Sequence, residues 1–299
     1  RRPLVDVSVV IVSYNTRELL SKCLSSLKVA TQNLKAEIIV SDNDSFDGTA
    51  DMVRKQFPGV KVIENRDNLG FSKANNVAIT SACGKYILIL NPDTEIEKDT
   101  IGKMIDFMEK RPEVGIATCK VVLPNGQLDR DCRRHFPTPA RSFTHFSGLS
   151  KIFRGSKIFD QYYMGYLSNR GEHEVDSCAG SFMFIRKKDL DRVGLFDEDF
   201  FFYGEDLDLC WRFKELGYKV VYTPVTKILH HKGAASGMKP TTTYITKATR
   251  QSKRRALAES TRAMKLFYQK HYQGKYPNFV DWLMFFAIWI LEKIRLAKA

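Results

Sequence analysis

The sequence predicts an α/β fold with a mostly parallel central sheet flanked by helices. Two observations predict this class. Short β-rich apolar runs alternate with segments of helical periodicity between Val5 and Glu95, and a polar cluster follows most of these runs. Strands that alternate with helices are typical of right-handed βαβ units. A chain of 299 residues is also long enough to bury a substantial core.

The first unit begins with a buried strand over Val5–Val12, where the sequence reads VDVSVVIV. A helix is expected over Arg17–Leu27, because apolar residues recur there at helical spacing. These residues are Leu19, Leu20, Cys23, Leu24 and Leu27. A second strand is expected over Glu37–Ser41 (EIIVS), which ends at a cluster of acids and amides.

The next units follow the same alternation. Asp47-Gly48-Thr49 opens a helix that runs to about Phe57, and Lys61–Glu64 is a short strand. A helix is predicted over Ser72–Ala82. The decapeptide Tyr86–Glu95 (YILILNPDTE) is predicted as a fourth strand that ends in paired acids.

Order is weaker in the second half of the predicted catalytic domain, residues 1–238. Residues 124–176 are rich in Gly, Pro, Arg and aromatics, and we interpret them as an irregular region on the acceptor side. Ser181–Ile185 reads as a strand and Glu205–Leu216 as a helix. A strand over Lys219–Tyr222 leads through Pro224 to residues 228–231.

The positive charge of the chain is concentrated at its C-terminal end. The formal net charge is +13, and residues 239–299 carry 13 lysines and arginines against three acids. We therefore expect residues 239–299 to form a basic, helical C-terminal extension that faces an anionic surface.

The apolar stretch Phe279–Leu291 contains one acid, Asp281. Its uninterrupted part, Trp282–Leu291, would span about 15 Å as a helix, which is too short to cross a bilayer. Two interpretations remain open, a helix packed on the catalytic domain and a helix lying in the membrane interface. Two tryptophans and neighbouring lysines and arginines favour the interface.

The six cysteines are scattered, without a CxxC pair. This pattern argues against a zinc site and a disulfide framework and favours a reducing compartment. The expected location is therefore the cytoplasm, in peripheral contact with the inner face of the cell membrane.

Three of the predicted strands end in polar residues, at Ser13–Asn15 (SYN), Asp42–Asp44 (DND) and Asn91–Glu95 (NPDTE). Parallel sheets bind ligands beyond the carboxyl ends of their strands, so these residues should share one ligand-binding edge. The sequence contains neither GxGxxG nor GxxxxGK[ST], so a dinucleotide fingerprint and a P-loop are not supported.

Several side chains at these positions have a structural and a chemical interpretation. Asp93 suits a polar turn, and it equally suits a hard divalent cation, which prefers oxygen ligands. Glu205 and Asp206 suit the N-terminus of a helix, and after three aromatics and a glycine they also suit a general base. His230 is either structural or a ligand that completes the shell of a carboxylate-bound metal.

Seven blocks of sequence, in order, resemble the family-2 glycosyltransferases of the GT-A fold. The similarity extends to the subgroup that includes rhamnosyltransferase-like enzymes of bacterial polysaccharide assembly. The blocks are VSVVIVSYN, VSDNDSFDGT, ENRDNLGFSKANN, LILNPDTEI, GSFMFIRKKDL, GLFDEDFFFYGEDLDLCWR and HHKGAAS. Each block is weak alone, and the seven together are highly specific.

The resemblance implies a role for each matched position. The nucleotide and donor sugar would contact Ser13, Tyr14, Asn15, Asp42, Asn68, Gly70, Asn75 and Asn91. Asp93 would hold a divalent cation (Mn²⁺ or Mg²⁺) with help from His230, because Asn91 replaces the first acid of the family's DxD-type motif. Asp206 would be the catalytic base with Glu205 in support, and Gly180 and Ser181 would lie on the acceptor side.

The expected reaction is an inverting sugar transfer from a nucleoside-diphosphate donor to a hydroxyl of a glycan or lipid-linked acceptor. The favoured donor is dTDP-rhamnose, followed by UDP-sugars. A metal-dependent nucleotidyltransferase would use the same acids but would release pyrophosphate. A nucleic-acid-binding module ranks lower, because it gives the polar strand ends no purpose, so no nucleic-acid partner is expected.

Overall fold

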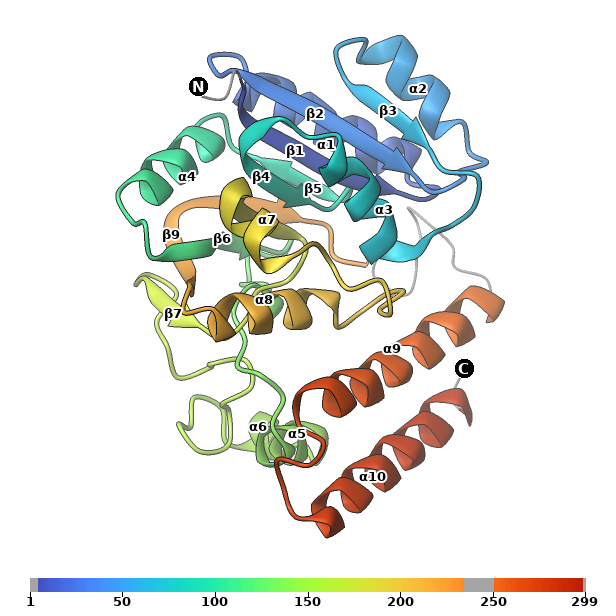
Figure 1. Ribbon diagram of the computed structural model, residues 1–299, viewed down its shortest axis with the longest axis vertical. Helices are drawn as coiled ribbons and strands as arrows, with labels where there is room; N and C mark the ends of the chain where they lie inside the picture. Colours follow the sequence, from blue (N-terminus) through green and yellow to red (C-terminus); the bar gives the residue numbers. More distant parts are fainter. Residues whose placement is uncertain (1–4, 234–249, 298–299) are drawn as a thin grey trace.

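A nine-stranded mixed sheet forms the centre of the molecule (Figure 1). The computed structural model describes this sheet and its helices over residues 5–233 and 250–297. The strands are β1 (Val5–Ser13), β2 (Ala36–Asp42), β3 (Lys61–Glu64), β4 (Gly84–Leu90), β5 (Thr94–Ile96), β6 (Val114–Val122), β7 (His173–Val175), β8 (Phe182–Arg186) and β9 (Lys219–His230). Their order is β3-β2-β1-β4-β8-β6-β9-β5, and β7 pairs with β9.

Helices cover this sheet and extend beyond it (Figure 1). They are α1 (Arg17–Ala30), α2 (Thr49–Gln56), α3 (Gly70–Thr80), α4 (Thr100–Glu109), α5 (Pro139–Phe146), α6 (Leu149–Ile152), α7 (Lys187–Val193), α8 (Glu205–Glu215), α9 (Arg250–His271), α10 (Asn278–Ala297) and the 3₁₀ turn η1 (Arg130–Cys132).

The N-terminal half of the sheet has the predicted parallel winding. β1 runs parallel to β2 and to β4, and β2 runs parallel to β3. Ser13 pairs with Asp42, and Val10 pairs with Ile89. The carboxyl ends of β1, β2 and β4 therefore meet at one edge, where the sequence predicted the ligand.

Beyond β4 the sheet is mixed. β8 runs antiparallel to both β4 and β6, and β9 runs parallel to β6. Parallel order is thus confined to β3-β2-β1-β4 and to the β6–β9 pair. The predicted α/β class with flanking helices is confirmed.

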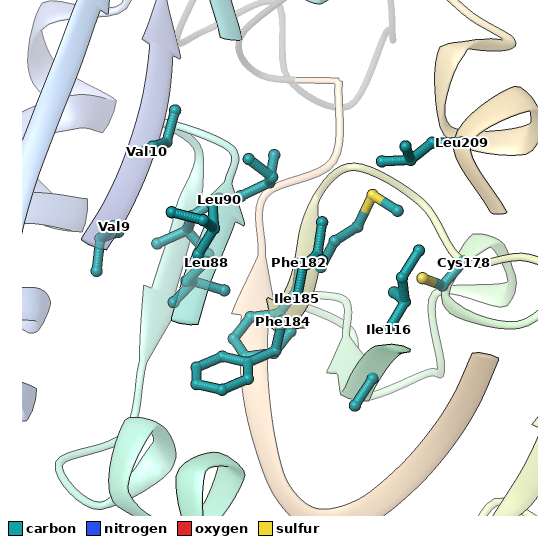
Figure 2. Packing of buried hydrophobic residues seen from close by; sticks show 14 of the residues in the cluster. Val9, Val10, Leu88, Leu90, Ile116, Cys178, Phe182, Phe184, Ile185 and Leu209 are labelled. Carbon is teal, nitrogen blue, oxygen red and sulfur yellow. The ribbon is translucent and has the colours of Figure 1, made fainter. Parts of the chain in front are cut away.

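The core is continuous across the junction of the two halves of the sheet. Figure 2 shows Leu88 and Leu90 of β4 beside Phe182 and Phe184 of β8, and all four side chains are buried. Leu209 of α8 joins the same cluster and has no exposed surface. Burial of apolar surface at about 25 cal/mol per Å² therefore fixes α8 against the sheet.

The predicted strand Tyr86–Glu95 is interrupted in the structure. β4 ends at Leu90, and residues 91–93 turn the chain into the separate strand β5. β5 pairs antiparallel with the end of β9, with Thr94 beside His230. A turn at Asn91-Pro92 is expected physically, since proline cannot donate a ladder hydrogen bond.

Pro224 does not end its strand, and β9 runs from Lys219 to His230. Its register with β6 shifts between the pairs Cys119–Thr223 and Lys120–Lys227. Proline is tolerated at such irregularities because no ladder hydrogen bond is required there.

The sequence reading assigned no elements to residues 97–123 or 187–193, where the structure has α4, β6 and α7. Residues 124–176 contain the short elements η1, α5, α6 and β7 between stretches without regular structure. These elements are too short for periodicity to reveal them.

α9 packs against α8 and ties the C-terminal helices to the rest of the molecule. His271 Nε2 lies 2.9 Å from Asp208 Oδ1. Trp211 of α8 contacts the ring of Phe267 of α9 and the ring of Tyr272, the residue after α9, with centroids 5.9 and 5.3 Å away. The boundary predicted at residues 238–239 lies outside the described residues, as does the end of the HHKGAAS block.

α10 lies beside α9 (Figure 1) and shows two different faces. Ile288 is buried, whereas Trp282 and Trp289 are 64% and 52% exposed. The helix therefore packs on one face and leaves an aromatic face uncovered. Among the described helices, none combines the length and apolar character needed to cross a membrane.

Candidate active site

The loops after β1 and β2 are joined by the side chains that the sequence singled out. Asn15, whose φ is 53°, accepts a hydrogen bond from Phe46 N at its Oδ1. Its own backbone N–H donates to Ser45 Oγ at 2.9 Å. Ser45 N donates to Asp42 Oδ2 at 3.0 Å. The ends of the two strands therefore form one rigid polar edge.

Ser13 and Tyr14 differ in how they contribute to this edge. Ser13 is buried, with its Oγ 2.7 Å from Thr16 Oγ1, so it fixes the start of α1. Tyr14 is 43% exposed and meets Phe46 edge-on, with ring centroids 6.5 Å apart. The exposed ring offers a flat apolar surface beside the polar groups.

Asp42 has an unsatisfied buried oxygen. Its Oδ1 has no hydrogen-bond partner among the described residues. Burial raises the pKa of Asp42 above its ordinary value. A buried polar atom without a partner costs free energy, so such an atom at the end of β2 favours a ligand that donates a hydrogen bond.

The segment NLGFS follows β3 and packs beneath the same edge. Asn43 Nδ2 donates to Gly70 O at 3.0 Å, and Gly70 N donates to Asn68 Oδ1 at 3.0 Å. Gly70 has φ of 79°, and a Cβ there would lie 2.4 Å from Phe201 O. Only glycine fits this position, where two backbone segments approach closely.

Two further predicted residues lie nearby. Asn75 donates from Nδ2 to Phe71 O at 2.8 Å, and its buried Oδ1 has no partner within the described part of the chain. Asn91 N donates to Ser181 O at 3.3 Å, which joins the end of β4 to the segment before β8. The predicted donor and acceptor sides are thus in direct contact.

Asp93 and His230 are brought together by the pairing of β5 with β9. His230 Nε2 lies 3.2 Å from Asp93 Oδ1, and its Nδ1 lies 2.9 Å from Asp129 Oδ2. Burial opposes a charge on the ring, but the two carboxylates outweigh it and raise the pKa of His230 to about 9. The imidazole therefore carries a proton at neutral pH and donates to both acids.

Lys232 extends this network toward residues 124–176. Its ammonium contacts the carboxylates of both Asp129 and Asp131. Burial alone would raise the pKa of Asp129. The hydrogen bond from His230 and the charge of Lys232 outweigh burial and hold that pKa below its usual range. Asp129 is therefore ionised.

The donor set fits a hard cation that is shared with a diphosphate. Within the described ranges, no group of three His, Cys, Asp or Glu side chains is arranged to hold a metal by itself. Magnesium, however, often takes one or two carboxylates and fills its shell with phosphate oxygens. The Asp93 carboxylate is a ligand of that type, whereas Asp129 is already paired with His230 and Lys232. His230 itself would need to lose its proton before it could ligate a metal.

Glu205 and Asp206 are placed by an unusual backbone. Tyr203 and Gly204 both have positive φ, 73° and 84°, immediately before α8 begins. Tyrosine in this conformation is strained, and such strain is typical of functional sites. The turn brings both acids into the first turn of α8, where they are buried.

Asp206 is held by groups from other segments. Arg134 Nη2 donates to Asp206 Oδ2 at 2.7 Å, and Gly180 N lies 3.4 Å from the same oxygen. A Cβ at Gly180 would lie 2.9 Å from Phe71 Cζ. Gly180 therefore lies between Asp206 and Phe71 of the NLGFS segment.

Unlike Asp206, Glu205 forms no ion pair with any of the described residues. Burial, with the neighbouring Asp206 carboxylate, raises the pKa of Glu205 to about 8. Its Oε2 has no hydrogen-bond partner in the described structure. Glu205 is therefore mostly protonated at neutral pH.

A cavity of about 310 Å³ lies beside Glu205 and Asp206. Glu205, Asp206, Arg134 and Asp131 line it, together with side chains of α9 and α10. A polar path of ion pairs leads from Asp93 through His230, Asp129 and Lys232 to Asp131. Asp131 lines the cavity together with Arg134 and Asp206.

Sequence reasoning missed four residues of this path and cavity. They are Asp129, Asp131, Arg134 and Lys232. The first three lie in the short charged run LDRDCRR, within the region interpreted as irregular. Paired acids and arginines in such a region were the available signal, but their partners lie 72 to 103 positions further along the chain.

The sheet and its flanking helices have the fold of the GT-A glycosyltransferases. A mannosyltransferase from Pyrobaculum calidifontis, solved with GDP-Man and Mn²⁺, superposes with a TM-score of 0.58 and 17% identity. The superposition covers 98% of this chain and 73% of the mannosyltransferase chain. The structure of GalNAc-T7 with UDP, GalNAc and Mn²⁺ superposes with a TM-score of 0.56 and 16% identity, over 77% of this chain and 44% of its own. These similarities establish the fold.

The chain belongs to glycosyl transferase family 2, which matches residues 8–194. It is 30% identical to rhamnosyltransferase WbbL of Escherichia coli, over 75% of this chain and 83% of that protein. It is 27% identical to the N-acetylglucosaminyl-diphospho-decaprenol L-rhamnosyltransferase of Mycobacterium tuberculosis, over 82% of this chain and 84% of that protein. The protein is therefore a glycosyltransferase similar to rhamnosyltransferases.

Proposed function

We propose that this glycosyltransferase moves a sugar from a nucleoside-diphosphate donor to a hydroxyl of a glycan or lipid-linked acceptor in cell-surface polysaccharide synthesis. The observation that carries the proposal is the shared cavity of Glu205 and Asp206 and its polar path to Asp93. A reaction of this type needs a base beside the acceptor and charge stabilisation beside the leaving group, and this path joins the two.

The nucleotide would lie along the edge formed by the ends of β1, β2 and β4. The unsatisfied Oδ1 of Asp42 is a hydrogen-bond acceptor for an N–H of the base, and the exposed ring of Tyr14 can lie against the base. Asn68, Gly70 and Asn75 would border the donor sugar. dTDP-rhamnose is the favoured donor, because both named relatives are rhamnosyltransferases; UDP-sugars come next.

Asp93 would hold a divalent cation, Mn²⁺ or Mg²⁺, at the end of β4. When bound, the cation supplies positive charge next to the diphosphate. The protonated ring of His230 contacts the Asp93 carboxylate through Nε2 and so would orient it toward the cation. Asn91 precedes this acid and would border the diphosphate.

Asp206 would act as the general base. Arg134 orients its carboxylate, so one oxygen can accept the proton of the acceptor hydroxyl. As that proton leaves, the acceptor oxygen forms a bond to the anomeric carbon, and the bond from that carbon to the diphosphate oxygen breaks. Attack opposite the leaving group inverts the anomeric centre. Glu205, protonated at neutral pH, would donate a hydrogen bond within the cavity.

The acceptor would enter from the side of Gly180 and Ser181, where residues 124–176 and the C-terminal helices form the walls. The exposed aromatic face of α10 supports peripheral contact with an anionic membrane on its cytoplasmic face. A lipid-linked acceptor would then meet the site at the membrane surface.

The test is a donor screen with product analysis. Purified protein, Mn²⁺ and a prenyl-diphosphate N-acetylglucosamine acceptor are incubated with dTDP-rhamnose or a UDP-sugar, with Asp206→Asn as the matched control. We expect nucleoside diphosphate to be released in step with glycosylated acceptor. Release of pyrophosphate would instead identify a nucleotidyltransferase.

A further inference from the structure

The cavity beside the catalytic acids has walls that a soluble sugar alone does not require. Besides Glu205 and Asp206, it is lined by Met264 of α9 and by Met284 and Ile288 of α10. These apolar side chains come from the helices of the C-terminal extension. An acceptor that fills the cavity would therefore contact apolar surface as well as the acids.

Arg295, near the end of α10, is the cationic group on this wall. Its guanidinium lies over the ring of Phe146, 5.8 Å from the centroid, and donates to Ser260 Oγ at 3.3 Å. Within the described chain it forms no ion pair with a carboxylate. Arg134, in the same cavity, is paired with Asp206.

A half-buried cation without a counter-ion is costly, because desolvation is not repaid by a partner. Burial lowers the pKa of Arg295, but the guanidinium remains charged at any physiological pH. Its planar donors match phosphate geometry and can form two parallel hydrogen bonds. The chemistry of the site therefore favours an anion with several oxygens.

We propose that Arg295 binds the phosphate through which a lipid-linked acceptor joins its sugar to its apolar chain. The inference rests on the proposed sugar transfer to such an acceptor and assigns the residue that recognises its phosphate. The sugar hydroxyl faces Glu205 and Asp206, the phosphate pairs with Arg295, and the apolar chain follows Met284 and Ile288 toward the exposed face of α10.

The experiment measures binding without transfer, so it is independent of the donor. The intact protein is titrated calorimetrically, in EDTA, with farnesyl diphosphate, farnesol and inorganic pyrophosphate. The variants are Arg295→Gln, Arg295→Lys and the control Lys293→Gln. Lys293 lies on the exposed face of the same helix, 5.9 Å from the Trp289 ring centroid, so this control removes an equal charge outside the cavity.

We expect farnesyl diphosphate to bind the wild-type protein more tightly than farnesol or pyrophosphate. Arg295→Gln should weaken farnesyl diphosphate binding about tenfold and leave farnesol unchanged. Lys293→Gln should have no effect, and Arg295→Lys should retain most of the affinity. The proposal is overturned if the wild type does not bind farnesyl diphosphate, if Arg295→Gln binds it normally, if Lys293→Gln loses as much, or if Arg295→Lys behaves like Arg295→Gln.

Vesicles of phosphatidylglycerol separate an acceptor phosphate from a lipid headgroup. Equal vesicle binding by the wild type and Arg295→Gln supports the acceptor, whereas loss in Arg295→Gln assigns Arg295 to a headgroup and overturns the proposal. Arg295-dependent binding without any sugar transfer would contradict the proposed function alone. Transfer that is indifferent to Arg295 would contradict this inference alone.

Discussion

Arg134 and Asp206 form a buried ion pair, with Nη2 2.7 Å from Oδ2 and side chains only 10% and 11% exposed. The pair joins a region of little regular structure to the first turn of α8. It therefore has two effects, because it fixes the position of Asp206 and forms part of one wall of the cavity. Its partners are far apart in sequence, so the pair depends on the whole fold.

Removing Arg134 should be strongly destabilising. Arg134→Met leaves the Asp206 carboxylate buried without a counter-ion, which typically costs about 3–5 kcal/mol. Urea unfolding followed by circular dichroism measures the loss. The control is Arg262→Met on α9, whose partner Glu259 lies 3.3 Å away in an exposed pair. A loss no larger than that of the control would show that the buried pair has little structural role.

The base assignment predicts a specific kinetic defect. Asp206→Asn keeps the shape of the side chain but cannot accept a proton, so kcat should fall about 10²- to 10⁴-fold. Nucleotide affinity, measured by calorimetry, should stay close to that of the wild type. Asp191→Asn, which changes an exposed acid on α7, is the control. Turnover like that of the wild type would remove Asp206 from the role of base.

The protonation of Glu205 gives the stability of the protein a defined dependence on pH. Its pKa rises from 4.5 to about 8 on folding, so the folded state binds the proton more tightly than the unfolded state. This contribution to stability is fully present below pH 4.5 and is lost as the pH rises to about 8.

Glu205→Gln should abolish that loss, because the amide stays neutral. The variant should exceed the wild type in stability by on the order of 1–3 kcal/mol at pH 9, and the difference should shrink toward pH 5. Thermal unfolding across this range measures it, with the exposed Glu215→Gln as control. Parallel curves for Glu205→Gln and wild type would contradict the raised pKa.

Part of this fold and site could be predicted from the sequence alone. Val5–Val12 and Glu37–Ser41 were predictable as strands. A strand that is buried on both faces has a nearly continuous apolar sequence, which is easy to recognise. The position of Asp93 at the sheet edge followed from the same logic. The pairing of β5 with β9, which sets His230 beside Asp93, did not. A three-residue strand has no periodicity, and antiparallel order in the second half of the sheet depends on long-range packing.

The cavity was still less predictable. Its acids were visible in GEDLDL, but Arg134 and Arg295 lie in segments whose local pattern indicates only polarity or a basic helix. The sequence was compatible with an α10 that packs on the protein and with one that lies in the membrane interface. The structure shows a feature that suits each interpretation. One face of this helix packs inward through Ile288, while the other presents Trp282 and Trp289 outward.

The metal assignment predicts a cation-dependent change in nucleotide binding. Asp93→Ala removes the carboxylate at the end of β4, and the gain in dTDP or UDP affinity caused by Mn²⁺ should fall at least about tenfold. A thermal-shift titration of nucleotide with and without Mn²⁺ measures this gain independently of turnover. Glu95→Ala is the matched control, because Glu95 lies two residues away and pairs with His231 at 2.7 Å. An unchanged response to Mn²⁺ in Asp93→Ala would exclude Asp93 as the ligand.

The aromatic face of α10 predicts how the protein meets a membrane. Phe286 lies between Trp282 and Trp289, with ring centroids 5.4 and 6.0 Å away, so three large rings form one exposed stripe. Amphipathic rings of this kind partition into the headgroup region, and nearby lysines and arginines add attraction to anionic lipid. The double variant Trp282→Ser/Trp289→Ser should therefore reduce flotation with phosphatidylglycerol vesicles roughly tenfold.

The residual binding of that variant should fall further at high salt, since only the electrostatic attraction remains. Leu216→Ser removes an exposed apolar side chain after α8 and is the control. Flotation that is unchanged in the double variant would mean that α10 does not contact lipid. The exposed rings would then need another partner, because an apolar stripe of this size is unfavourable in water.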